Sequence, residues 1–151
     1  MKIQDKYYKN IERLLYNYNM LKINIEIADK QLEELKGEDG MSGIAYDGVQ
    51  TSETYKFNSQ TENAAERNIT AEELTLRRKE KLENKLETLD RLIEGLNEIE
   101  KTVIEMYYIE NRQWWKVAYK IKYSERHCKR IRSEAIGKLA VGLYGEKAME
   151  E

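Results

Sequence analysis

The first part of the chain carries one regular apolar seam. Over residues 3–36, apolar or aromatic side chains recur at alternating steps of four and three residues. This heptad pattern predicts a single long helix, which must bury the seam against another helix to be stable. Gly37 follows the last seam residue and is expected to end the helix in a left-handed cap. The seam consists of Tyr7, Ile11, Leu14, Tyr18, Leu21, Ile25, Ala28, Leu32 and Leu35.

Residues 37–68 lack any apolar period. They contain four glycines and many Ser, Thr, Asn and Gln side chains, which predicts a long loop, with helical structure beginning at about residues 61–68. Three aromatic side chains, Tyr46, Tyr55 and Phe57, are candidates to pin this loop onto the helices.

A second seam follows the loop. Thr70 and Glu73 have capping-box spacing, which predicts that a helix begins there. Two heptad-bearing helices joined by a loop suit an antiparallel pair within one chain. They equally suit pairing between chains in a homodimer, and the pattern leaves both open. The seam residues are Leu74, Leu82, Leu86, Leu89, Ile93 and Leu96.

From residue 92 the spacing changes to that of short helices. Leu96, Ile99, Val103, Ile104 and Tyr107 give one short helix its inner face, and residues 109–112 form a connection. Trp114, Val117, Ala118 and Ile121 share one face of a second helix. Residues 122–124 predict a turn in which Ser124 caps a final helix that buries Cys128, Ile131, Ala135 and Leu139, with Arg132 at the edge of that face. This order predicts a helix-turn-helix unit.

The outward face of the final helix is basic and polar. At 100° per residue, Arg126, Arg130, Ser133 and Gly137 point away from the core, with His127 and Lys129 on the flanks. Trp114 is expected in the core. Trp115 and Tyr119 face outward, either towards DNA or a protein partner or onto the N-terminal helices. The predicted DNA-binding residues are Lys120, Lys122, Tyr123, Ser124, Arg126, His127, Lys129, Arg130 and Ser133.

Charge supports the same division of roles. The 151 residues include no proline and carry a net charge of −2. Residues 112–151 contribute +5 and residues 1–111 contribute −7, and residues 112–138 alone hold nine basic and two acidic side chains. A basic segment on an acidic body suits a polyanionic partner such as double-stranded DNA. We therefore predict an all-α protein with a helical body over residues 1–91, including a loop at about 37–68, and a DNA-binding domain over residues 92–145.

Other classes of function are disfavoured. One cysteine, Cys128, and one histidine, His127, supply neither a disulfide framework nor a usual zinc site, and they diverge by about 100° on a helix. No phosphate-binding glycine loop or nucleophile elbow is present. We expect no enzyme activity, cofactor or metal. No membrane span or leader pattern is found, so we expect a cytoplasmic protein.

The same residues resemble a known family. The segments at residues 92–96, 103–108, 114–118, 123–124 and 135–139 resemble region 4 of bacterial sigma factors. The resemblance is to phage and prophage transcriptional regulators of the ArpU/RinA type, which have segments similar to residues 46–52 and 62–66. It implies activation of phage late or packaging genes by promoter binding, with RNA polymerase as a further partner. The glycine common in the region 4 turn is Lys122 here, and no region 2 is visible.

Three hypotheses therefore stand at this point. The leading one is a sequence-specific transcriptional regulator that binds DNA through residues 114–139. The second is a phage terminase small subunit, which also joins a DNA-binding motif to helical oligomerisation segments. The third is a helical adaptor that binds RNA polymerase without contacting DNA.

Overall fold

The computed structural model describes residues 2–41 and 59–150, with side chains described for residues 2–37 and 70–150. Within these ranges the regular elements are all helical, so the chain is all-α as predicted. Tyr46, Tyr55 and Phe57 lie outside the described residues. No helix in the described part is both long and apolar enough to cross a membrane. The elements are α1 (Asp5–Tyr16), α2 (Tyr18–Met41), α3 (Ser59–Glu94), α4 (Glu98–Ile104), the π-helix η1 (Glu105–Ile109), α5 (Trp114–Ile121), α6 (Glu125–Tyr144) and the 3₁₀ turn η2 (Gly145–Ala148).

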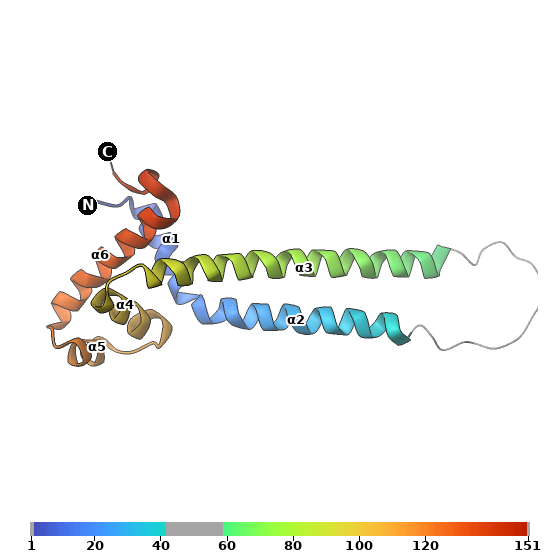
Figure 1. Cartoon of the computed structure of the whole chain (residues 1–151), viewed down its shortest axis with the longest axis horizontal. Helices are drawn as coiled ribbons and strands as arrows, with labels where there is room; N and C mark the ends of the chain where they lie inside the picture. The colour runs from blue at the N-terminus through green and yellow to red at the C-terminus, as the bar shows by residue number, and fades with distance from the viewer. Residues whose placement is uncertain (1, 42–58, 151) are drawn as a thin grey trace, which may run out of the picture. The chain divides into compact units, whose positions relative to one another are not determined.

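The chain forms two compact units. Unit 1 comprises Met1–Lys22 and Asn84–Glu151, and unit 2 comprises Ile23–Glu83. The sequence places the division between residues 91 and 92 instead. The structure differs because α1 lies alongside α6 in unit 1 (Figure 1), so the first helix shares a core with the last one.

The first apolar seam is divided between two helices. The prediction of one unbroken helix is wrong at Asn17, whose backbone (φ −91°, ψ 7°) ends α1. The Asn17 N–H donates to the Arg13 carbonyl at 3.1 Å, and its own carbonyl accepts from the Leu21 N–H at 2.9 Å. The break turns Ile11 and Leu15, both fully buried, into the core of unit 1.

The main core of unit 1 lies between α1, the end of α3, α4 and α6. Its largest fully buried side chains include Leu15, Leu89, Ile136 and Leu139. Burying a side chain of this size stabilises the fold by about 1.5–3 kcal/mol. Tyr18 also joins this core and donates its hydroxyl hydrogen to Asp90 Oδ1 at 2.6 Å.

The two ends of the described chain are tied together within unit 1. Ile3 and Met149 form an antiparallel bridge. The Gln4 N–H donates to the Ala148 carbonyl at 2.9 Å, and the Glu150 N–H donates to the Lys2 carbonyl at 3.0 Å. These backbone hydrogen bonds hold the segment before α1 against the segment after η2.

A capping box sets the start of α4. Asn97 Oδ1 accepts from the Glu100 N–H at 2.8 Å, and the Asn97 N–H donates to Glu100 Oε2 at 3.3 Å. Such reciprocal bonds satisfy two amides that the first helical turn otherwise leaves free. Starting the helix here turns Glu100 inward, where it is 4 % exposed, and turns Ile99 outward, where it is 41 % exposed. The prediction that Ile99 belongs to the inner face is therefore wrong.

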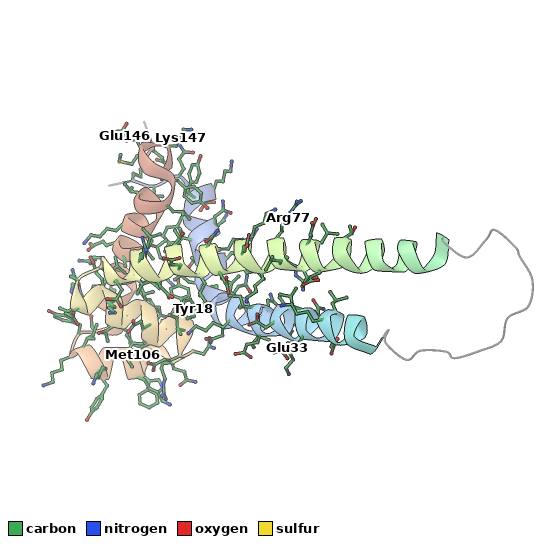
Figure 2. All side chains as sticks on the ribbon, turned by 45° about the vertical axis from the view of Figure 1, so that its right-hand side comes forward. Tyr18, Glu33, Arg77, Met106, Glu146 and Lys147 are labelled. Atoms are coloured by element: carbon green, nitrogen blue, oxygen red, sulfur yellow. The ribbon has the colours of Figure 1, made fainter. Side chains whose placement is uncertain are left out.

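Unit 2 is an antiparallel pair formed by the two helices within one chain. Gln31 on α2 bonds Arg78 on α3, and Asp29 pairs with Lys79 at 2.5 Å. The helices run side by side (Figure 1), with Glu33 and Arg77 on their outer sides (Figure 2). Between them lie Ala28, fully buried, and Leu32, 9 % exposed.

Three predicted boundaries in unit 2 are wrong. Gly37 lies inside α2, which continues to Met41, because a single glycine lowers helix stability by only about 1 kcal/mol. Thr70 lies inside α3, which begins at Ser59, so it does not start a helix, and helix over residues 61–68 is confirmed. Leu74, expected in the seam, is 62 % exposed. Residues 42–58 of the predicted loop lie outside the described residues.

Candidate nucleic-acid interface

A short helix, α5, is held by one apolar face. Val117 is fully buried, and Trp114 stacks on Tyr107 with ring centroids 4.1 Å apart and planes 21° from parallel. Ala118 and Ile121 pack on the same cluster, as the spacing predicts. Trp114 is therefore a core residue. The cluster is shared with Val103 of α4 and with Cys128 and Ile131 of α6.

A tight turn joins α5 to α6. Lys122 adopts a left-handed conformation (φ 61°, ψ 37°), which costs a residue with a Cβ about 1–2 kcal/mol. The Tyr123 N–H then donates to the Ala118 carbonyl at 3.3 Å. Ser124 caps α6 by accepting from the His127 N–H at 3.2 Å, which confirms the predicted N-cap. Lys122 thus makes the turn without the glycine.

Helix α6 buries one face and exposes another over its first half. Cys128, Ile131, Ala135 and Leu139 are buried, as predicted. Arg126, Lys129, Arg130 and Ser133 are exposed. Gly137, expected to point outward, is buried because α1 and α4 both pack on the second half of α6, leaving little free surface there. The accessible basic face is therefore confined to the helix's N-terminal half.

The basic side chains of this region are largely free of carboxylate partners. Arg112 lies 3.3 Å from Glu110, and Lys138 lies 2.5 Å from Glu100. Among the described residues, no carboxylate lies within ion-pair distance of the remaining exposed cations. Their charge is therefore available to an external anion. These cations are Lys116, Lys120, Lys122, Arg126, Lys129 and Arg130.

Arg132 occupies an aromatic site beside this face. Its guanidinium carbon lies 5.4 Å from the Trp114 ring centroid and 5.9 Å from that of Tyr107. Burial lowers the pKa of Arg132, but Tyr108, Tyr8, Glu12 and Tyr107 raise it, leaving the pKa above its usual value. Its Nε is buried without a hydrogen-bond partner. Arg132 therefore joins α6 to the cluster, a role that the sequence indicates only by placing it at the edge.

The predicted site residues lie together around the turn and the first half of α6. His127 is half-buried, and its ring meets the edge of Tyr123 with centroids 4.7 Å apart. Ser133 lies at the far end, 3.3 Å from the Tyr8 hydroxyl. The rest are exposed. Cys128 is fully buried, and burial raises the pKa of its thiol. In the part of the chain with described side chains, no cluster of three or more His, Cys, Asp or Glu residues is suited to a metal.

Residues 7–141 match the family model described as "Protein of unknown function (DUF722)". The chain belongs to this family. The match includes α6 up to Val141 and therefore the whole of the candidate interface. No curated protein and no solved structure matches the sequence. The description assigns no activity to the family, so the argument for function rests on the interface.

Proposed function

We propose that this protein is a sequence-specific DNA-binding transcriptional regulator that acts in the cytoplasm. The observation that carries the proposal is the division of α6 into two faces. Cys128 and Ile131 are buried, while Arg126 and Arg130 are exposed and have no carboxylate partner among the described residues. A recognition helix needs this division, because it must be held from behind while its other face enters the major groove.

The arrangement of the turn supports the same proposal. Ser124 fixes the start of α6, and Arg126 and Arg130 lie one helical turn apart near that end. Arginine binds phosphate as well as the O6 and N7 atoms of guanine, so these residues supply affinity and, where they reach a base edge, specificity. The resemblance to sigma factor region 4 supports a promoter as the target and RNA polymerase as a second partner.

Duplex binding with matched variants tests the proposal. Genome-wide selection with the purified protein supplies the target, and fluorescence anisotropy on that duplex measures affinity. Arg126→Ala plus Arg130→Ala is expected to lower affinity by about tenfold or more and to reduce the slope of affinity against salt by about two contacts. Arg77→Ala plus Lys81→Ala removes the same charge at the same spacing from α3, where both side chains are exposed. Equal affinities for both double variants would refute the proposal.

A second candidate is an oligomeric DNA-binding protein of the terminase small-subunit kind. It is favoured by apolar side chains that unit 2 leaves exposed. Ile23 and Ile27 on α2 are 43 % and 44 % exposed, and Leu74 and Leu76 on α3 are 62 % and 44 % exposed. Mass photometry separates the candidates, because a ring of many subunits favours the terminase and a monomer or dimer favours the regulator.

A further inference from the structure

Helix α5 and its turn present a second surface, which we call the aromatic–lysine surface. It consists of Trp115, Lys116, Tyr119, Lys120, Lys122 and Tyr123. Its three rings are among the exposed large side chains of the described residues: Trp115 is 56 %, Tyr119 is 85 % and Tyr123 is 43 % exposed. Trp115 and Tyr119 are one helical turn apart, so they lie on the same side of α5. The possibility that these two rings pack on neighbouring helices is wrong for the described unit 1.

The surface is hollowed. A shallow depression of about 640 Å³ lies between its rings and lysines, with Ala118 also in its lining. A depression of this size is large enough for a ligand the size of a nucleotide or a short peptide. Because Ala118 has a small side chain, the two flanking rings and the lysine stems form the walls.

Two of the rings are held in place by neighbouring side chains. Trp115 donates its indole N–H to Gln113 Oε1 at 2.6 Å, and the Lys116 ammonium lies 5.3 Å from the centre of the Trp115 ring. The Tyr123 ring rests against His127. A ring that is already positioned loses less conformational freedom when a ligand stacks on it.

The charge around the rings is of one sign. Residues 111–124 include four basic side chains and no acidic one. The ammonium groups of Lys116, Lys120 and Lys122 have no carboxylate partner among the described residues. Lysine is depleted at the centres of protein–protein interfaces, whereas aromatic rings interleaved with basic groups are typical of surfaces that bind single-stranded nucleic acid.

We propose that the aromatic–lysine surface binds unpaired nucleotides of single-stranded DNA, with bases stacked on Trp115 and Tyr119 and phosphates on the lysines. In a duplex each base is covered by its neighbours, so exposed rings have nothing to stack on. The choice of DNA over an acidic protein rests on the proposed function, which brings a DNA strand to α6. A regulator with both surfaces holds duplex DNA through α6 and a locally opened strand through α5.

Two double variants test the surface. Trp115→Ala plus Tyr119→Ala removes both rings, and Trp115→Phe plus Tyr119→Phe keeps them. On an oligothymidine strand of about 12 nucleotides, the alanine pair is expected to lower affinity by about tenfold or more. The phenylalanine pair is expected to stay within about threefold of the parent chain. Oligothymidine is also expected to quench the tryptophan fluorescence of the parent chain, an effect that a purely structural role for Trp115 does not produce.

The two DNA ligands separate this proposal from the proposed function. On duplex DNA we expect the Trp115 and Tyr119 alanine pair to bind as the parent chain does and the Arg126 and Arg130 pair to bind weakly. Oligothymidine binding without duplex binding would leave the surface standing and remove the regulator. Duplex binding without oligothymidine binding, or an alanine pair that binds oligothymidine normally, would overturn the surface. Tighter binding of a polyglutamate peptide than of oligothymidine would overturn it in favour of an acidic protein partner. Matching circular dichroism and urea midpoints establish that each variant is folded.

Discussion

Lys138 on α6 donates a hydrogen bond from Nζ to the buried Oε1 of Glu100 on α4, at 2.5 Å. The same carboxylate accepts the Asn97 N–H through its other oxygen. One buried side chain thus caps α4 and ties it to the helix that carries the candidate interface.

Removal of Lys138 is expected to destabilise unit 1. Lys138→Met leaves a carboxylate that is 4 % exposed without its cation, at a cost of about 1–2 kcal/mol in the free energy of unfolding. Urea unfolding followed by circular dichroism measures this cost. Lys9→Met is the control, because its ion pair with Asp5 is on the surface and should contribute less than about 0.5 kcal/mol. Equal losses for the two variants would contradict a special role for Glu100.

Alkaline pH is expected to destabilise unit 1 through its tyrosines. Burial and the hydrogen bond to Asp90 raise the pKa of Tyr18 to about 12, whereas an unfolded tyrosine has a pKa of about 10. Because the folded pKa is the higher one, this stability is present in full below pH 10 and is lost as the pH rises towards about 12.

Tyr18→Phe tests that expectation. The variant cannot form a phenolate at this position, so its unfolding free energy should fall less steeply above about pH 10 than that of the parent chain. Chemical unfolding at a series of alkaline pH values gives the two slopes. Parallel slopes would assign the loss to other groups, such as Tyr108, whose pKa burial and Glu12 also raise.

The left-handed turn at Lys122 predicts a stabilising substitution. Lys122→Gly removes the steric cost at φ 61° but makes the unfolded chain more flexible, so the net gain is expected to be up to about 1 kcal/mol. Lys122→Asn, which also tolerates this conformation and also removes the charge, separates backbone effects from loss of the lysine. Thermal unfolding gives the order glycine, asparagine, lysine. A glycine variant less stable than the parent chain would contradict the assigned turn.

Cys128 is expected to react slowly with thiol reagents in the native protein. Its side chain is fully buried, and burial raises the pKa of the thiol, so little of the reactive thiolate is exposed. Labelling with a chromogenic disulfide should be slow in buffer and fast in urea. Because Cys128 lies in the cluster shared by α4, α5 and α6, the native labelling rate measures opening of that cluster. Fast labelling in buffer would show that the cluster is loosely packed.

Local sequence signals predict α5 and α6 well. The spacing of Trp114, Val117 and Ala118 fixes the inner face of α5, and Ser124 fixes the start of α6. These signals act within one helical turn, so one sequence is enough to find them. The exposed basic face of α6 follows from the same periodicity, except at Gly137, where packing by other helices decides the outcome.

Tertiary packing decides what the local pattern leaves undetermined. Asn17 interrupts a perfect heptad seam with no glycine or proline to mark the break, because α1 packs on α6 more than one hundred residues away in the sequence. The same contact moves the division between the units. Thr70 has the spacing of a cap, yet the helix continues through it. The aromatic site of Arg132 also depends on contacts between distant segments, which no local period contains.

The backbone bonds that join residues 2–4 to residues 148–150 offer a spectroscopic handle on unit 1. A donor dye at Lys2 and an acceptor dye at Glu150 would sit within efficient energy-transfer range while this unit is folded. Any event that releases either strand would separate the dyes, and events confined to α2 and α3 in unit 2 would not. A single doubly labelled molecule would therefore indicate whether unit 1 stays closed while it holds a DNA strand.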